Sequence, residues 1–298
     1  MDNTLACIAG EEVYRQIRSD RLDAESIGPR DTPFGPSGEI FRVGCDDSWF
    51  YLLARYGEGL GKTAPSAVPY QANIYALKDL GAAAIVAWGS GGAITHSMAV
   101  GDLVVVADVI DQTSRREKTY YQHSPLGYLR QFPVFCPTLR STCLQTLGEL
   151  NIVHHDQAVA AVTEGPRLET PAEVRMLGTM GAEVVTHSFL PEMFLARELQ
   201  ICYAAICYVV NYAETGSRHR PFLATGLFEA PTDSGASRRL VKAMNAFGDV
   251  MGHLCRIVAG GDTPCTCGEP IAQAAREAGL GEDWRTWLNP PRTGCDFS

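Results

Sequence analysis

The sequence lacks an excess of positive charge, having 25 Lys and Arg against 34 Asp and Glu and a formal net charge of −9. Nucleic-acid binding requires a basic face, so this composition argues against a nucleic-acid partner. The sequence also lacks an apolar run of about twenty residues, the length of a membrane-spanning helix. Its first residues, Met1-Asp2-Asn3, lack the basic and then apolar layout of a signal peptide. We therefore expect a cytoplasmic protein with no membrane partner.

The cysteine spacing of a zinc ribbon is absent as well, although the sequence contains 10 cysteines. The closest pair, Cys265 and Cys267, is separated by one residue rather than by the two residues of a zinc ribbon. Most of the others lie in apolar runs and are predicted to be small core residues: Cys7, Cys143, Cys202, Cys207 and Cys255. Metal binding or oxidation of the close pair together with Cys295 is the alternative. We predict free thiols in a reducing compartment and no metal site.

What the sequence does contain is a large supply of apolar residues, with 46% hydrophobic and 20% charged residues. Continuous apolar runs typical of buried strands alternate with segments that carry apolar residues at helical spacing. The predicted strands are residues 5–10, 41–43, 49–54, 82–88, 103–110, 158–162 and 201–210. The main predicted helices are residues 69–80, 137–150, 236–258 and 271–278, with short helices after Pro171 and Pro191. This alternation predicts an α/β fold with a central mixed β-sheet flanked by helices.

Glycine clusters and polar stretches mark the predicted loops. We expect loops at the glycines of residues 57–61 and 89–92, and an irregular excursion over residues 111–136. The α/β pattern occupies residues 1–260 as a single domain. Residues 261–298 form a C-terminal extension with a short helix and a tail rich in proline and glycine.

Polar residues stand where the predicted strands end. Gly10, Arg55, Gly89, Glu164 and Asn211 all fall at such positions. In sheets of this kind, ligands bind at the carboxyl ends of the strands. The polar groups are densest between residues 163 and 216, which are therefore predicted to hold most of the site.

Several motifs in this chain resemble those of the trimeric purine nucleoside phosphorylase and methylthioadenosine phosphorylase family. They are Asp31-Thr32-Pro33-Phe34-Gly35, Tyr70-Gln71-Ala72-Asn73-Ile74, Gly101-Asp102, Glu164-Gly165-Pro166-Arg167, Pro191-Glu192 and Ile201-Cys202-Tyr203-Ala204. They cover about residues 5–258 in order, and they favour the branch that acts on 6-oxopurines and methylthioinosine. The resemblance implies a nucleoside-phosphorylase-like fold, a homotrimer and a role in purine salvage. It also implies a purine nucleoside substrate with inorganic phosphate as co-substrate and no metal or organic cofactor.

The resemblance also implies which residues handle the purine base. Asn211 matches the position that assists the leaving base at N7, and an amide there can also donate to a carbonyl at C6. Glu169 matches the carboxylate that accepts from N1–H of a 6-oxopurine, so both are predicted to be catalytic. Leu168 takes the place of a stacking phenylalanine. The alternative is that Glu169 caps the helix that begins at Pro171 and that Asn211 makes a turn.

Other residues match positions around the sugar and its 5′ group. His187 stands where the family has a methionine under the ribose, and it is predicted either to contact a sugar hydroxyl or to be a buried structural histidine. Ser188 follows it and is predicted to bind substrate and phosphate near a helix N-terminus. Tyr121 and His123 lie in the excursion that, in the family, reaches a neighbouring subunit's 5′ pocket. Whether that pocket takes a hydroxyl or a methylthio group stays open, as does guanine versus hypoxanthine.

The phosphate site is where the chain departs from the family. The glycine-rich phosphate loop is replaced by Ala9-Gly10-Glu11-Glu12, whose carboxylates repel phosphate. The remaining candidates for phosphate binding are Arg55, Tyr56, Ser90 and Ser188.

The altered phosphate loop leaves the nucleophile open. The predicted function is cleavage of the N-glycosidic bond of a 6-oxopurine or 5′-methylthio purine nucleoside with phosphate. One alternative is a phosphate-independent hydrolase with water held by Glu11 or Glu12. A related one is a nucleotide glycosidase that uses Arg218-His219-Arg220. A third is a nucleoside-binding protein without activity.

Overall fold

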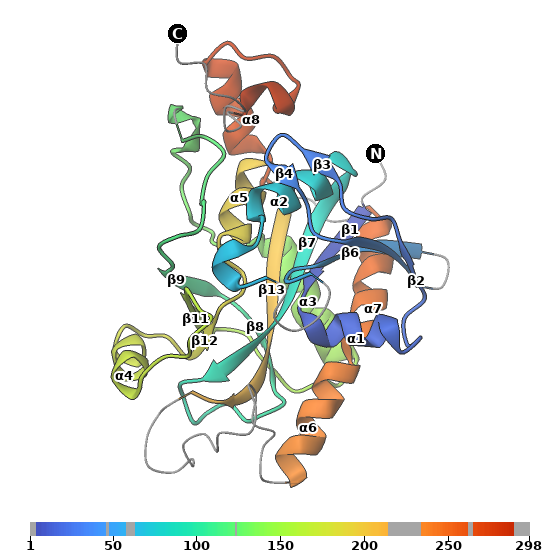
Figure 1. Cartoon of the computed structure of the whole chain (residues 1–298), viewed down its shortest axis with the longest axis vertical. Helices are drawn as coiled ribbons and strands as arrows, with labels where there is room; N and C mark the ends of the chain where they lie inside the picture. Colours follow the sequence, from blue (N-terminus) through green and yellow to red (C-terminus); the bar gives the residue numbers. More distant parts are fainter. Residues whose placement is uncertain are drawn as a thin grey trace.

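Four parallel strands form the centre of the computed structural model, which describes residues 4–45, 48–57, 63–122, 124–213, 234–261 and 265–288. They lie in the order β6 (Ser48–Ala54), β1 (Thr4–Ala9), β7 (Ala82–Ala93) and β13 (Cys202–Tyr212). Ala9 pairs with Ala54 on one side and with Trp88 on the other, and Trp88 pairs with Ile206. The carboxyl ends of β6 and β1 and the middle of β7 and β13 therefore lie level (Figure 1).

Shorter strands extend this sheet on both sides and make it mixed, as predicted. β5 (Ile40–Cys45) and β2 (Ala24–Ser26) add antiparallel strands beyond β6, while β8 (Leu103–Val105) and β10 (His154–His155) lie beyond β13. A branch of β9 (Asp108–Gln112), β11 (Val159–Thr163) and β12 (Val184–Thr186) joins the end of β7 through an antiparallel pairing of β12. A separate small hairpin consists of β3 (Asp31–Thr32) and β4 (Gly35–Pro36).

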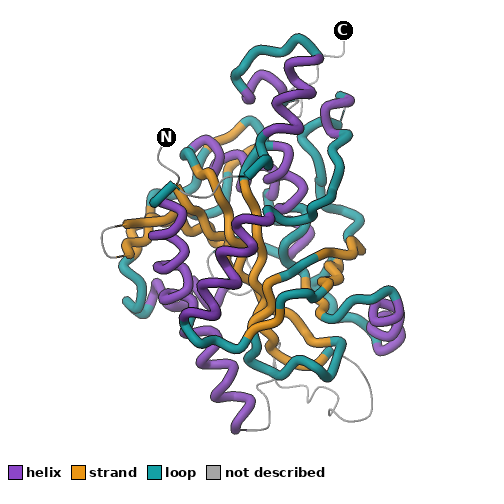
Figure 2. Tube along the Cα trace, turned by 180° about the vertical axis from the view of Figure 1, so that it is seen from behind, coloured by secondary structure: helices purple, strands orange, loops and turns teal. Residues whose placement is uncertain are grey.

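Helices cover both faces of the sheet, because the central strands are apolar on both sides. Along β1, Ala6 and Ile8 belong to one buried cluster, whereas Leu5 and Cys7 belong to another on the opposite face. The first face is covered by α2 (Tyr70–Asp79), α5 (Glu192–Glu198) and α8 (Glu269–Glu277). The second face is covered by α1 (Glu11–Arg18), α3 (Pro137–Glu149), α6 (Ser234–Asn245) and α7 (Phe247–Ala259). The layers can be followed from behind in Figure 2.

The sequence predictions of an α/β fold and of most elements are confirmed, but three boundaries were wrong. The run 103–110 is two strands, β8 and β9, which pair with different partners. The pattern over 236–258 is two helices that meet at Ala246. Strand β7 does not end at Trp88 but continues through Gly89–Gly92, where a loop was predicted.

The glycines of β7 allow close approach rather than a turn. A Cβ on Gly89 would lie 3.0 Å from Ser188 Oγ, and one on Gly92 would lie 2.9 Å from Asn211 Oδ1. Any larger residue would push these two side chains away from the strand. The glycine-rich stretch thus lets two predicted site residues lie directly against the sheet. Of the other predicted glycine loop, residues 58–62 lie outside the described part of the chain.

The C-terminal extension packs on the first face of the sheet. Ile271 and Ala275 of α8 are buried there, and the ring of Trp284 lies 5.0 Å from that of Tyr75. The remaining elements are α4 (Pro171–Thr179) and the 3₁₀ turns η1 (Pro65–Ala67), η2 (Pro125–Gly127) and η3 (Trp284–Trp287). No helix in the described ranges combines the length and the apolar character needed to cross a membrane.

Candidate active site

Arg116 joins the loops that surround the candidate site. Its side chain is fully buried, and its Nη1 donates to the carbonyl oxygens of His187 at 2.9 Å and Leu190 at 2.5 Å. Its Nη2 donates to the carbonyl oxygens of Thr163 and Glu164, each at 2.9 Å. Arg116 thereby ties the excursion over residues 111–136, in which it lies, to the loops that follow β11 and β12. No sequence signal marks Arg116, because it lies in a stretch without periodicity and its partners are backbone carbonyls.

Glu164, in the loop after β11, contacts the same part of the excursion as Arg116. Its carboxylate accepts from the backbone N–H groups of Ser114 at 2.6 Å and Arg115 at 3.0 Å, and it lies 3.4 Å from Arg116 Nε. Burial raises the pKa of Glu164, but these hydrogen bonds and the Arg116 charge outweigh it and hold the pKa below its usual value. Glu164 is thus an ionised residue that holds the loops in place.

Glu169 and His187 lie together above these loops. His187 Nε2 is 3.3 Å from Glu169 Oε1, which also accepts from the Thr163 hydroxyl. Burial raises the pKa of Glu169, but the hydrogen bonds from His187 and Thr163 lower it by more. A carboxylate can only accept, so Nε2 carries the proton of this hydrogen bond, and in the neutral ring Nδ1 is then an acceptor.

The helix after Glu169 does not need this carboxylate. Thr170 caps α4 by accepting from the Glu173 N–H, and the Glu173 side chain accepts in return from the Thr170 N–H. This reciprocal arrangement satisfies the helix N-terminus. The alternative prediction that Glu169 caps the helix is therefore wrong, and its carboxylate is directed to His187.

Asn211 belongs to strand β13 rather than to a turn. The pairing of β13 with β7 shifts between Val209 and Asn211, so Asn211 lies opposite Gly92 after a bulge. A bulge turns a strand locally and re-aims the side chain that follows it. The alternative prediction of a turn at Asn211 is thus wrong, because Asn211 sits in a strand at the edge of the site.

A group of hydroxyls lies at the amino end of α5. Ser188 is 5% exposed, and its Oγ lies 3.4 Å from the hydroxyl of Tyr56. The Thr186 hydroxyl accepts from the Ser188 N–H at 3.1 Å and donates to the Ser90 carbonyl oxygen at 2.7 Å. The structure therefore brings together Tyr56 and Ser188, two of the residues that the sequence predicted for phosphate binding, with Thr186 as a further support. Ser90 contributes only its backbone carbonyl to this group, because its side chain lies beside the Tyr208 phenol.

Arg55, the fourth predicted phosphate residue, is held by Glu192. The two side chains form a bidentate ion pair, with Nε to Oε1 at 2.6 Å and Nη2 to Oε2 at 2.9 Å, and both are fully buried. Arg55 also donates to the carbonyl oxygens of Trp88 and Ile8. Four of its five N–H donors therefore have partners among the described residues. Burial lowers the pKa of Arg55, but Glu192 raises it by more, so Arg55 keeps its charge. The Arg55 charge is thus largely balanced inside the protein.

Glu11 and Glu12 occupy the first turn of α1, directly after Gly10. Negative side chains stabilise a helix N-terminus, which would otherwise attract an anion. Glu11 Oε1 lies 3.4 Å from Arg15 Nε, whereas its Oε2 is buried without a hydrogen-bond partner among the described residues. Burial raises the pKa of the Tyr208 phenol, and the nearby Glu12 carboxylate raises it further. The chain's own carboxylates therefore stand at this helix N-terminus.

The remaining predicted residues are placed as follows. Leu168 is 42% exposed beside Glu169, as a side chain that contacts a planar base would be. Tyr121 is 3% exposed in the core of its own chain, so the structure does not support its prediction as a residue of a neighbouring pocket. His123 and the trio Arg218-His219-Arg220 lie outside the described residues.

Four cysteines come together away from these residues. Cys7, Cys143, Cys207 and Cys255 are buried, as predicted. The sulfur atoms of four others lie within 4.8 Å of one another, and we refer to them as the four-cysteine cluster: Cys136, Cys202, Cys265 and Cys267. Cys202 was predicted to be a core residue and Cys136 was not singled out, because the sequence does not show which distant strand and helix ends meet. Cys295 lies outside the described residues.

Comparison with known proteins gives a consistent match. Residues 23–264 match the model of the phosphorylase superfamily. A protein of Methanothermobacter thermautotrophicus described as a probable S-methyl-5′-thioinosine phosphorylase is 38% identical over 70% of this chain and 71% of its own length. The 6-oxopurine nucleoside phosphorylase of Pyrococcus furiosus is 33% identical over 70% and 79%. A crystal structure of a methylthioadenosine phosphorylase from an antarctic soil metagenomic library has a TM-score of 0.80 at 24% identity, covering 96% of this chain and 98% of its own, which shows a common fold.

Proposed function

Because the chain belongs to the phosphorylase superfamily, we propose that it transfers the pentosyl group of a 6-oxopurine nucleoside to inorganic phosphate. It is an enzyme of the purine nucleoside and methylthioadenosine phosphorylase type. The observation that carries the substrate class is the 38% identity, over 70% of the chain, to the relative described as a methylthioinosine phosphorylase. The reaction breaks the bond between C1′ and N9 and forms a bond from C1′ to a phosphate oxygen.

Asn211 assists the departing base in this proposal. The electron pair of the broken bond moves into the purine, and N7 gains a proton from solvent. The Asn211 amide oxygen accepts from N7–H while its NH₂ donates to the carbonyl at C6. As electron density moves into the purine, the C6 carbonyl oxygen becomes a stronger acceptor for the Asn211 NH₂, so this hydrogen bond lowers the barrier rather than only binding substrate. The position of Asn211 against Gly92 supports the role, because the strand supplies a rigid support.

Glu169 reads the edge of the base. Both hydrogen bonds to its side chain, from Thr163 and His187, use Oε1. Oε2 is therefore the atom that accepts from N1–H of hypoxanthine or guanine. Adenine presents an acceptor at N1, so the ionised carboxylate and this acceptor repel each other. The exposed Leu168 side chain covers the face of the same base.

His187 binds the ribose. Its Nε2–H is directed to Glu169, which leaves Nδ1 to accept from a sugar hydroxyl. The same contact couples the sugar to the base, because movement of His187 displaces Glu169. None of these residues is assigned to the 5′ substituent, so a comparison of methylthioinosine with inosine is needed to identify the preferred substrate.

Phosphate is bound by the hydroxyls at the amino end of α5. Ser188 and Tyr56 supply donors for its oxygens, and the remaining Nη1–H of Arg55 supplies one more. The Arg55–Glu192 pair gives little net positive charge, so we expect a high KM for phosphate. No metal or organic cofactor takes part, because orientation of phosphate and assistance at N7 supply the chemistry. A homotrimer located in the cytoplasm and working in purine salvage completes the proposal.

One observation favours a second candidate, a phosphate-independent hydrolase. Glu11 Oε2 is buried without a partner in the described chain, at the helix N-terminus where the family places phosphate. Such a carboxylate could take a proton from an attacking water.

The two candidates differ in what they need for base release. We would incubate the protein with inosine, guanosine or methylthioinosine, each with and without inorganic phosphate, and quantify free base by chromatography. The first candidate predicts base release only with phosphate, together with a pentose 1-phosphate. Equal release in both conditions would establish the hydrolase, and retained binding without release would establish a binding protein.

A further inference from the structure

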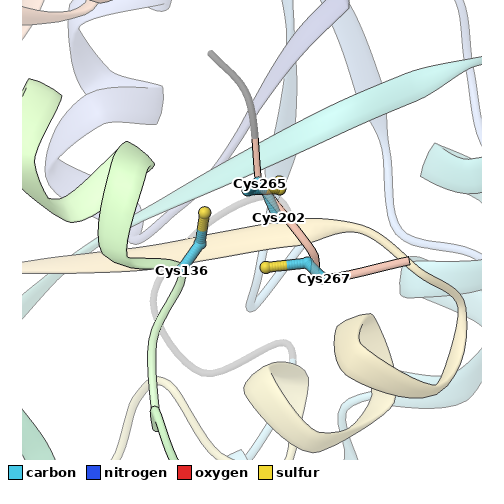
Figure 3. Close-up of side chains that lie close together, drawn as sticks. All are labelled: Cys136, Cys202, Cys265 and Cys267. Carbon is cyan, nitrogen blue, oxygen red and sulfur yellow. The ribbon is translucent and has the colours of Figure 1, made fainter. Parts of the chain in front are cut away.

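The four-cysteine cluster is built from three segments that are far apart in the sequence. Cys136 is the N-cap of α3 and Cys202 is the first residue of β13, whereas Cys265 and Cys267 precede α8 on the C-terminal extension. Figure 3 shows the four side chains around a common space, with Cys136 and Cys202 coming from the body of the domain. This convergence is independent of the residues proposed for the nucleoside.

Backbone and side-chain hydrogen bonds hold the three segments in register. The Cys136 N–H donates to the Tyr203 carbonyl oxygen at 3.0 Å, so the ends of α3 and β13 lie side by side. The Gln200 side chain donates to the Gly268 carbonyl oxygen at 2.9 Å, which ties the extension to the loop before β13. The cluster is therefore placed by contacts that do not involve sulfur, as expected for a preformed ligand set.

The spacing of the sulfur atoms fits a single metal ion. A tetrahedral zinc site with Zn–S bonds of about 2.3 Å has S···S separations of about 3.8 Å. In the cluster all four sulfurs lie within 4.8 Å of one another, and Cys202 Sγ and Cys265 Sγ are 3.0 Å apart. A disulfide bond requires two sulfurs about 2.05 Å apart, whereas all four cysteines are free thiols in the structure. We propose that the four-cysteine cluster is a structural binding site for one Zn²⁺ ion.

The surroundings suit four thiolates around a divalent cation. The Leu139 N–H lies 3.5 Å from Cys136 Sγ and donates to it, as backbone amides commonly do to metal-bound sulfur. Four thiolates and Zn²⁺ carry a net charge of −2, and two cations lie close enough to interact with it. Burial lowers the pKa of both Arg197 and Lys78. Thiolates at Cys267 and Cys136 partly oppose this at Arg197, and one at Cys202 does so at Lys78, so both cations lie near the cluster. On binding, the thiols release their protons to solvent.

Such an ion would fasten the C-terminal extension to the domain. Four protein ligands close the coordination shell and leave no position for substrate, so the role is structural rather than catalytic. The extension carries α8, whose Ile271 side chain enters the core and which packs against η2 of the excursion. Cys136 lies where that excursion ends. The metal would thus connect the end of the excursion, at Cys136, to the start of the extension, at Cys265 and Cys267.

The test uses the full chain purified under reducing conditions. Metal content is measured by mass spectrometry after removal of loose metal and reloading with Zn²⁺, and we expect about one Zn²⁺ per chain. Because Cys265 is exposed, Cys265→Ser opens no core cavity, and we expect it to lose most of the zinc and to lower Tm. The matched control is Cys45→Ser, a half-buried cysteine outside the cluster, which should keep the zinc. Replacement with Co²⁺ should give the intense visible bands of tetrahedral thiolate coordination.

Three results would overturn the proposal. The first is less than about 0.1 Zn²⁺ per chain after reloading, with all four thiols reactive. The second is a disulfide within the cluster, detected by mass spectrometry, in protein prepared under reducing conditions. The third is equal zinc content in Cys265→Ser and the wild-type chain, which would assign the metal to another place.

Discussion

Substitution Glu192→Ala removes one partner of the buried Arg55 ion pair and is expected to destabilise the protein strongly. The carboxylate accepts two hydrogen bonds from Arg55, at 2.6 and 2.9 Å, and one from the Tyr203 hydroxyl at 2.9 Å. Removing one partner of a buried pair leaves an uncompensated charge and costs about 3–5 kcal/mol. For a chain of 298 residues, a loss of about 4 kcal/mol corresponds to a decrease in Tm of about 6 °C.

The assay is thermal unfolding followed by circular dichroism at one fixed protein concentration. The matched control is Asp79→Asn, which breaks the ion pair with Arg285 at the surface, where both side chains are about half exposed. Exposed pairs contribute little, so Tm should hardly change. A double variant, Arg55→Leu with Glu192→Leu, should recover much of the loss because no lone charge remains. If Glu192→Ala lowers Tm no more than Asp79→Asn does, Arg55 is not held as the structure indicates.

Three further predictions concern catalysis and pH. Asn211→Ala should lower kcat for phosphorolysis about 10²–10⁴-fold; a change of only a few-fold in steady-state assays would remove Asn211 from leaving-group assistance. Glu169→Gln should lower kcat/KM for inosine about 100-fold or more and leave that for adenosine unchanged or higher, because the amide can donate to N1 of adenine; an equal loss for both nucleosides would contradict base reading by Glu169. Burial raises the pKa of Glu198 from 4.5 to about 7, and hydrogen bonds from Thr119 and Tyr120 only partly offset it. The native state therefore holds a proton that the unfolded state releases, so this contribution is complete below pH 4.5 and is lost as pH rises through about 7. Urea unfolding across this range should show Glu198→Gln gaining up to about 3 kcal/mol relative to wild type, whereas a constant difference would mean that Glu198 has an ordinary pKa.

Periodicity and apolar runs predicted the layers of the fold, because burial on one or both faces imposes those patterns directly. These patterns did not predict features that depend on contacts between residues far apart in the sequence. The glycines of β7 indicated a loop, since nothing in the sequence shows that Ser188 and Asn211 need the space. The break between β8 and β9 was missed for a similar reason, because both halves are apolar enough to continue one strand.

The candidate site was predictable only in part. Glu169 and His187 lie near one another in the sequence and follow strand ends, so their meeting could be expected. Arg116 could not be, because it acts on backbone carbonyls that have no sequence signature. The pairing of Arg55 with Glu192 joins residues 137 positions apart and depends on the end of β6 lying next to the first residue of α5. The four-cysteine cluster depends in the same way on chain segments that meet only in the folded protein.

The most direct test of the central claim is the dependence of base release on phosphate. Initial rates of hypoxanthine release from inosine and from methylthioinosine would be measured across a phosphate titration, starting from protein dialysed free of phosphate. A rate that begins near zero and saturates with phosphate, with a pentose 1-phosphate formed in equal amount to the base, is the predicted result. A rate that is the same at zero and at saturating phosphate, with free pentose as the product, would contradict it and assign the nucleophile to water.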